Sequence, residues 1–187
     1  MRVTGGASRG RRLATLRHSG LRPTGSRVRE ALFDILGGRV RDAALLDLFA
    51  GTGSVGVEAL SRGAREAVFV ERDRRAARLI EENLARAGLS SAGRVLAVAA
   101  DRAVARLAVE RRRFDVVFVD PPYEMGVPED LLSRVAELLS PQAVLVIEHA
   151  TRAAEAAPPG GPLRLGRRYR YGDTCLSLLR HAAPPGA

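Results

Sequence analysis

Five short apolar runs lie between residues 44 and 147, and segments with helical spacing of apolar residues separate them. The runs cover residues 44–49, 67–70, 95–99, 114–119 and 143–147, and the helical segments cover 54–61, 73–87, 103–111 and 128–139. A strand that is apolar on both faces is typical of a parallel sheet with helices on each side. Repeated strand–helix units also impose right-handed crossovers. The alternation therefore predicts an α/β fold.

The flanking segments extend this prediction. Residues 26–36 have helical spacing, and two glycines follow them. Residues 151–162 form a linker rich in Ala, Pro and Gly, and segments 163–171 and 174–180 then alternate around a Gly-Asp pair, which indicates a hairpin. We therefore expect a Rossmann-like, seven-stranded sheet, mostly parallel with a C-terminal antiparallel hairpin, and helices on both faces.

Basic residues are unevenly distributed. The net charge is +9, all basic residues are arginine, and residues 1–30 hold eight arginines against Glu30 alone. A one-sided basic block indicates a polyanionic partner, because neutralised phosphates release counterions. We expect a small basic N-terminal extension at 1–25, an α/β domain at 26–181 and a disordered tail at 182–187. RNA contacts are predicted for the extension's arginines, namely Arg2, Arg9, Arg11 and Arg12.

Other classes of protein are disfavoured. Cys175 is the single cysteine, so no internal disulfide is possible, which fits a reduced, cytoplasmic setting. His18, His149 and His181 lie far apart in sequence without cysteine partners, so no metal site is expected. No apolar run approaches the length of a membrane span, and no signal region opens the chain.

A glycine-rich loop follows the first apolar run. Gly51, Gly53 and Gly56 match the dinucleotide fingerprint, and Glu71 lies twenty residues beyond Gly51. That pattern leaves an NAD-dependent oxidoreductase open. Any ligand with an adenosine group needs the same backbone approach, together with a carboxylate for its ribose hydroxyls.

Two further carboxylates favour a different ligand. Asp47 precedes the glycines, where it would repel a pyrophosphate but suits a cationic amino-acid group. Asp101, after the third run, is placed to accept a hydrogen bond from an adenine amine. A ligand with adenosine, a positive sulfonium and an amino-acid tail fits the set.

The fourth run ends in a stiff corner. Asp120 stands at the carboxyl end of the predicted strand, where open α/β sheets bind ligands. Pro121 and Pro122 fix the backbone and remove two donors. The Asp120 carboxylate and the Pro121 carbonyl can accept from the exocyclic amine of a planar base, which stacks on Tyr123 at about 1–3 kcal/mol. The corner predicts a site for a base with an amino group.

These motifs resemble known families. The segment Asp47-Leu48-Phe49-Ala50-Gly51-Thr52-Gly53 and the segment Asp120-Pro121-Pro122-Tyr123 resemble the cofactor loop and catalytic motif of class I S-adenosylmethionine-dependent amino methyltransferases. The N-terminal pattern narrows the resemblance to the RsmD family. It comprises Gly5-Gly6, Arg9-Gly10-Arg11, Leu21-Arg22-Pro23-Thr24 and Arg27-Val28-Arg29-Glu30-Ala31-Leu32-Phe33.

The resemblance implies methylation of N2 of one guanine in 16S ribosomal RNA of the small subunit, with S-adenosylmethionine as cofactor. It also assigns roles to residues of this chain. Catalysis falls to Asp120, Pro121, Pro122 and Tyr123, and cofactor binding to Arg22, Thr24, Arg27, Asp47, Phe49, Gly51, Gly53, Glu71 and Asp101. A monomer is expected.

Three alternatives stay open on the sequence. One is an amino methyltransferase for adenine or cytosine of DNA or another RNA, although the chain is too small for a separate DNA-recognition domain. The others are an NAD-dependent oxidoreductase and a non-catalytic RNA-binding assembly factor.

Overall fold

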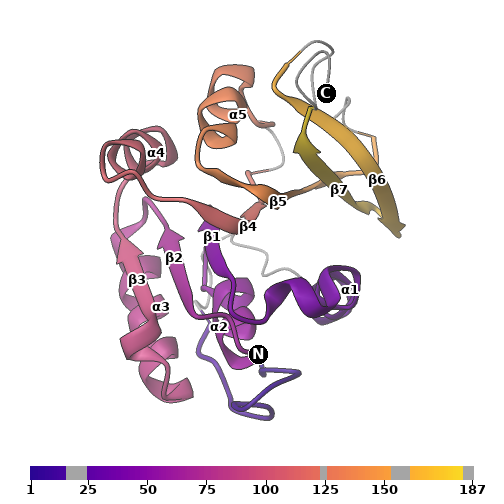
Figure 1. Ribbon diagram of the computed structural model, residues 1–187. Helices are drawn as coiled ribbons and strands as arrows, with labels where there is room; N and C mark the ends of the chain where they lie inside the picture. Colours follow the sequence, from indigo (N-terminus) through magenta and orange to yellow (C-terminus); the bar gives the residue numbers. More distant parts are fainter. Residues whose placement is uncertain (16–24, 123–125, 153–160, 183–187) are drawn as a thin grey trace.

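The computed structural model describes residues 1–15, 25–122, 126–152 and 161–182. Its centre is a seven-stranded sheet with the order β3-β2-β1-β4-β5-β7-β6 (Figure 1). The strands are β1 (Ala44–Leu48), β2 (Glu66–Val70), β3 (Gly93–Leu96), β4 (Phe114–Val119), β5 (Leu139–Ala150), β6 (Leu163–Tyr171) and β7 (Thr174–His181). The first five are parallel, whereas β7 runs antiparallel to β5 and to β6. The predicted fold class is confirmed.

Helices cover both faces of the sheet. They are α1 (Ser26–Leu36), α2 (Ser54–Ser61), α3 (Arg74–Ala87), α4 (Ala100–Val109) and α5 (Glu129–Ala136), with short 3-10 turns η1 (Gly37–Val40) and η2 (Ser90–Ala92). Figure 1 shows α1, α2 and α3 on one side of the sheet and α4 and α5 on the other. Each side has its own apolar core. Strands β1, β2 and β4 and residues 143–148 of β5 are therefore largely buried on both faces, as their sequences predict, whereas the edge strand β6 is mostly exposed.

Local capping explains where α3 starts and stops. The Asp73 side chain accepts hydrogen bonds from the backbone N–H groups of Arg75 and Ala76, at 2.7 and 3.0 Å. At the other end Gly88 takes a left-handed conformation with φ of 74°. Such conformations cost little for glycine. The predicted bounds of this helix, 73–87, agree with the structure to one residue.

Four elements have bounds that differ from the predicted ones by more than one residue, and for the two strands the reason is that pairing partners decide where a strand ends. Helix α4 covers Ala100–Val109, against the predicted 103–111. Strand β3 pairs with β2 only from Gly93 to Leu96, so it starts and stops earlier than the predicted 95–99. Strand β5 continues to Ala150, since it pairs with β7 after β4 has ended. Pro128 is the N-cap of α5, which ends at Ala136, short of the predicted 139.

The N-terminal segment is packed against the domain. Val3 and Leu13 are buried in the core that contains α1, α2 and α3. An isolated bridge joins Arg2 and Arg12 and closes the segment into a loop. Residues 1–15 therefore share the core of the α/β domain.

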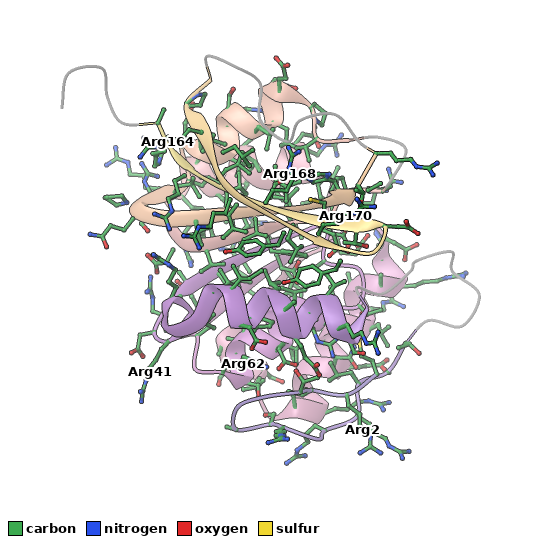
Figure 2. The ribbon with its side chains drawn as sticks, turned by 90° about the vertical axis from the view of Figure 1, so that its right-hand side faces the viewer. Arg2, Arg41, Arg62, Arg164, Arg168 and Arg170 are labelled. Carbon is green, nitrogen blue, oxygen red and sulfur yellow. The ribbon has the colours of Figure 1, made fainter. Side chains whose placement is uncertain are left out.

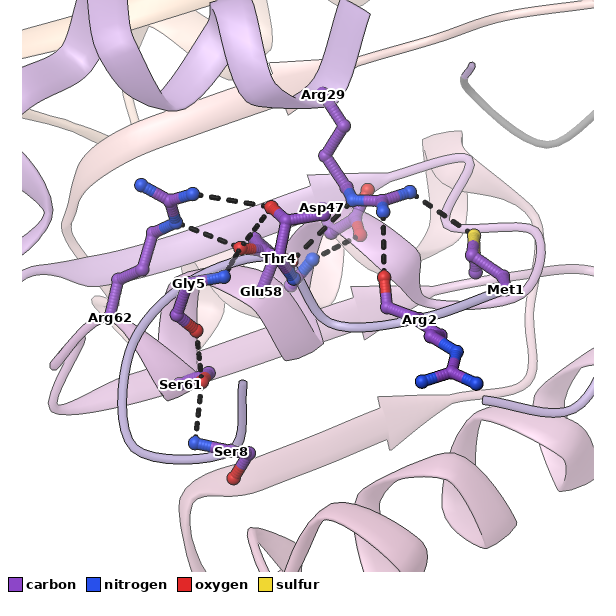
Figure 3. A network of polar contacts seen from close by, with 11 residues as sticks. Met1, Arg2, Thr4, Gly5, Ser8, Arg29, Asp47, Glu58, Ser61 and Arg62 are labelled. Atoms are coloured by element: carbon purple, nitrogen blue, oxygen red, sulfur yellow. Dashed lines mark hydrogen bonds and ion pairs between the residues drawn. The ribbon is translucent and has the colours of Figure 1, made fainter. Parts of the chain in front are cut away.

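A buried carboxylate anchors this segment (Figure 3). Glu58 of α2 accepts hydrogen bonds from the backbone N–H groups of Thr4 and Gly5, at 2.8 and 2.7 Å. It also receives the Thr4 hydroxyl and the Arg62 guanidinium, each at 2.8 Å. The side chain of Glu58 is 1% exposed, so its charge is compensated almost entirely by these groups and by Arg29.

Arg29 has an internal role that its place in the basic block did not indicate. Its side chain is 1% exposed, lies 3.6 Å from Glu58 Oε2, and donates to the Arg2 carbonyl at 2.9 Å (Figure 3). Burial lowers the pKa of Arg29, and the Glu58 charge opposes that shift. This arginine is therefore part of the core and is removed from the surface that a polyanion could reach.

Candidate active site

Three carboxylates gather at the carboxyl edge of the sheet. Asp47 lies near the end of β1, Glu71 directly follows β2, and Asp120 directly follows β4. Asp47 is 2% exposed, and this burial raises its pKa to about 7. The negative charges of Asp120 and Glu71 raise the pKa further, while a hydrogen bond from the Gly56 N–H opposes the rise. These three carboxylates would favour the binding of a cationic ligand group at this edge of the sheet.

The glycine loop links two of these strand ends. The Ala50 N–H donates to the Val70 carbonyl at 2.9 Å, and the Gly51 N–H donates to Glu71 Oε2 at 2.9 Å. Gly51 has φ of 54°, and a side chain added there would meet no atom within 4 Å. The loop is therefore held against β2 while its backbone stays open to an approaching ligand.

The other two glycines serve packing. Gly53 has φ of 74°, and a Cβ there would lie 2.9 Å from the Ile80 side chain of α3. A Cβ on Gly56 would lie 2.2 Å from the Phe69 ring of β2. Both glycines let the first turn of α2 come close to its neighbours, and for Gly56 this is the packing role of the third glycine in the fingerprint.

Glu71 is oriented by backbone donors. Its two oxygens accept from the N–H groups of Gly51 and Asp73, at 2.9 and 2.8 Å. Each carboxylate oxygen has a second lone pair, so the group can still accept from ligand hydroxyls. Its fixed position at the end of β2 suits the ribose role that the sequence predicts.

Phe49 shows a feature that sequence reasoning missed. Its φ is 69°, a left-handed conformation that is uncommon for residues other than glycine. The half-buried ring packs against the core beneath α4 and α5. Backbone strain of this kind often accompanies binding loops. No sequence signal marks it.

The Asp120 corner is tied to the strand that carries the glycine loop. The Asp120 N–H donates to the Leu48 carbonyl at 3.4 Å, which joins the end of β4 to the end of β1. Asp120 is half-buried, Pro121 is buried and Pro122 is exposed. Tyr123 lies outside the described residues. The corner and the loop thus stand side by side at one edge.

The remaining predicted residues are more peripheral. Asp101 is exposed in the first turn of α4, five residues after β3 ends at Leu96. Arg27 is exposed in the first turn of α1, while Arg22 and Thr24 lie outside the described residues. The four predicted RNA contacts are all exposed on the N-terminal segment, namely Arg2, Arg9, Arg11 and Arg12.

Asn83 is a further residue that sequence reasoning missed. It is completely buried in α3, and its amide donates to the carbonyls of Thr52 and Ala14, at 3.0 and 3.2 Å. Its Oδ1 accepts from the Ala14 N–H at 2.7 Å. Asn83 therefore connects the glycine loop to the N-terminal segment. The signal was available, because an amide on the apolar face of an amphipathic helix requires partners.

Among the described residues, no group of three His, Cys, Asp or Glu side chains is placed to hold a metal ion. No helix in the described part of the chain has the length and apolar character to cross a membrane.

Comparison with known proteins gives consistent matches. The family model described as "Conserved hypothetical protein 95" matches residues 1–180. The chain is 38% identical to "Ribosomal RNA small subunit methyltransferase D" of Escherichia coli K12, over 79% of this chain and 74% of that protein. The protein of the same name from Haemophilus influenzae is 37% identical, over 79% and 78%. A solved structure of a hypothetical protein from Thermus thermophilus superposes with a TM-score of 0.82 at 36% identity, covering 96% of this chain and 99% of that one.

Proposed function

Since the chain belongs to the RsmD family, whose model spans residues 1–180, we propose that it methylates 16S ribosomal RNA of the small subunit. The reaction is transfer of a methyl group from S-adenosylmethionine to the exocyclic N2 of one guanine. The substrate guanine and the cofactor are those implied by the family. The geometry of the site supports both.

One contact carries the proposal on the structural side. The hydrogen bond from the Asp120 N–H to the Leu48 carbonyl holds the base-binding corner against the strand that leads into the glycine loop. A base amine bound at Asp120 and a methyl donor bound at the loop would therefore lie close together, which supports the proposal. An NAD-dependent oxidoreductase does not need a rigid acceptor corner of this kind.

The residues of the loop fit the proposed cofactor. Gly51 allows the backbone to approach, Glu71 retains acceptor capacity for ribose hydroxyls, and the exposed Asp101 is available to the adenine amine. Asp47 lies behind the loop, where a cationic amino-acid group would favour its ionised form. When bound, S-adenosylmethionine would supply a methyl group activated by its positive sulfur: N2 of guanine would bond to the methyl carbon as the carbon–sulfur bond breaks in line, S-adenosylhomocysteine would leave, and N2 would lose one proton to solvent.

The corner would act on the other reactant. The Asp120 carboxylate and the Pro121 carbonyl would accept hydrogen bonds from the two N2–H groups, which would direct the nitrogen lone pair toward the methyl group and stabilise the positive charge that develops on the nitrogen. Tyr123 would stack on the base, which has to leave its RNA stack first. Positioning of this kind can supply about 7–11 kcal/mol. No covalent enzyme intermediate is required.

Methyl transfer to small subunits tests the proposal directly. Purified protein with radiolabelled S-adenosylmethionine and small subunits that lack the modification should yield N2-methylguanine in 16S RNA. Binding of S-adenosylhomocysteine but not of NADH should accompany it. Absence of transfer, or transfer only to adenine or cytosine, would reject the assignment.

A variant then tests the corner. Asp120→Ala should abolish turnover and leave the affinity for S-adenosylhomocysteine nearly intact. Asp34→Ala, on the exposed side of α1, is the matched control and should behave like the wild type. Equal losses of turnover and cofactor affinity in Asp120→Ala would move Asp120 into the cofactor site.

A further inference from the structure

The outer strand of the sheet carries a dense set of arginines. Strand β6 has a single neighbour, β7, and so forms one edge of the sheet. Its nine residues include four arginines and no acidic residue, and all four side chains are exposed. We call this surface the β6 arginine strip; it consists of Arg164, Arg167, Arg168 and Arg170.

The charge of the strip is not neutralised by ion pairs. Around β2, β3 and α4, several arginines do form ion pairs, such as Arg65 with Asp115 at 3.0 Å and Arg94 with Glu110 at 2.6 Å. Within the described ranges, no arginine of the strip takes part in an ion pair. The strip shares this property with the four exposed arginines of the N-terminal segment, so both surfaces present positive charge to a ligand.

The register of the sheet relates the strip to the Asp120 corner. Val119, the last residue of β4, pairs with Ile147 of β5; Ile147 pairs with Ser177 of β7, and Ser177 pairs with Arg168. Arg168 thus lies on the same line across the sheet as the residue before Asp120. Three strand spacings separate them, or about 14 Å.

Hydrogen bonds also hold the β6–β7 hairpin in place at the end of β5. The Thr151 N–H donates to the Asp173 carbonyl at 2.9 Å, which attaches the β6–β7 turn to the end of β5. Arg170 lies just before that turn, and its Nε donates to the Gly172 carbonyl at 3.2 Å. The end of the strip that holds Arg168 and Arg170 is therefore at the sheet edge that carries the candidate active site.

We propose that the β6 arginine strip is a second RNA-binding surface, which holds the phosphate backbone of nucleotides flanking the target guanine. The inference rests on the proposed function. It adds a surface far in sequence from the N-terminal arginines. Figure 2 shows Arg164, Arg168 and Arg170 along β6 above α1, with Arg2 below α1 on the same side of the molecule. A substrate RNA would then be held on both sides of α1.

The chemistry of the strip favours a phosphate backbone. Arg168 and Arg170 are two residues apart on an extended strand, which spaces their Cα atoms by about 6.6 Å along it. Guanidinium groups bind phosphate oxygens with paired hydrogen bonds. Tyr171 is 36% exposed beside them and offers a ring for an unstacked base.

Protection of the sheet edge is the competing explanation. Charged side chains on an edge strand do prevent pairing with other chains. Basic side chains suit edge protection as well as phosphate binding, so the sign of the charge does not separate the two explanations. The effect of removing the arginines on RNA binding and on self-association does separate them.

The test compares two double variants of the full-length protein. Arg168→Gln/Arg170→Gln removes two charges from the strip. Arg111→Gln/Arg113→Gln removes two exposed charges just before the start of β4, at the amino-terminal ends of the parallel strands and so away from the candidate active site. Both are assayed for binding to a 16S RNA fragment across a salt series, for methyl transfer to small subunits, for S-adenosylhomocysteine affinity, and for self-association by sedimentation.

The strip variant should bind RNA more weakly, with a salt slope reduced by about 1.4 if two single-strand phosphate contacts are lost. Its KM for the RNA substrate should rise while cofactor affinity stays unchanged, and the control variant should match the wild type. Wild-type RNA affinity and salt slope in the strip variant would overturn the inference, and self-association in that case would identify edge protection as the strip's role. If the wild-type protein transfers no methyl group to any RNA, the proposed function fails, and RNA binding by the strip is still decided by the salt series.

Discussion

The buried Asp47 predicts an unusual dependence of stability on pH. Its pKa in the folded protein is about 7, against an ordinary value of 3.8, because burial disfavours the charged form. Well below the ordinary value the carboxyl group is neutral in both folded and unfolded chains. Between the two pKa values it ionises only on unfolding, so the free energy of unfolding falls as pH rises. Above the folded-state pKa the carboxyl group is ionised in both states, and the decrease in the free energy of unfolding reaches its full size.

The magnitude follows from the size of the pKa change. Each pH unit across this window removes about 1.4 kcal/mol, and the whole window removes up to about 4 kcal/mol. Asp47→Asn abolishes the ionisation, and its amide oxygen can still accept from the Gly56 N–H. The variant should therefore gain stability relative to the wild type as pH rises from about 4 to about 8.

Urea unfolding of both proteins at half-unit steps across this pH range measures the difference. The exposed Asp34→Asn serves as a control for loss of a surface carboxylate and should follow the wild-type profile. Parallel pH profiles for the wild type and Asp47→Asn would contradict the prediction, because they would mean that Asp47 ionises as readily in the folded chain as in the unfolded one.

Two further predictions concern the anchoring of the N-terminal segment. Gly6→Ala should destabilise the protein at least twice as much as Gly10→Ala in chemical denaturation. Both glycines have positive φ, which costs about 1–2 kcal/mol for alanine. Only at Gly6, however, would the added Cβ fall 1.7 Å from the Ser61 carbonyl oxygen. Similar losses would mean that the segment can shift away from α2. Glu58→Ala should cost about 3–5 kcal/mol, because it leaves the buried Arg29 without its ion partner. A loss below about 1 kcal/mol, measured by the same unfolding assay, would show that water replaces the carboxylate.

Sequence reasoning was most successful where local patterns are sufficient. The β4 run was predicted to the residue, because a nearly uninterrupted apolar run that ends in two prolines leaves few alternatives. The glycine loop and the carboxylates at strand ends were located for a related reason. Parallel strands bring their carboxyl ends to one edge whatever the details of packing, so Asp47, Glu71 and Asp120 had to be near each other.

Only the tertiary structure decided which charges are buried and what they contact. Arg29 has the same sequence context as its exposed neighbours, yet packing of α1 on the N-terminal segment places it in the core. Asn83 acquires its role because α3 lies between the loop and Ala14. Likewise Arg168 lies in the same row of paired residues as the end of β4 because of the register of three successive strand pairings. This register is a long-range property that composition does not encode. Local patterns in the sequence were therefore sufficient to predict the order of the strands and helices and the residue types at the strand ends. The burial of individual side chains and the register between strands depend on contacts between distant segments, so they became known only from the folded structure.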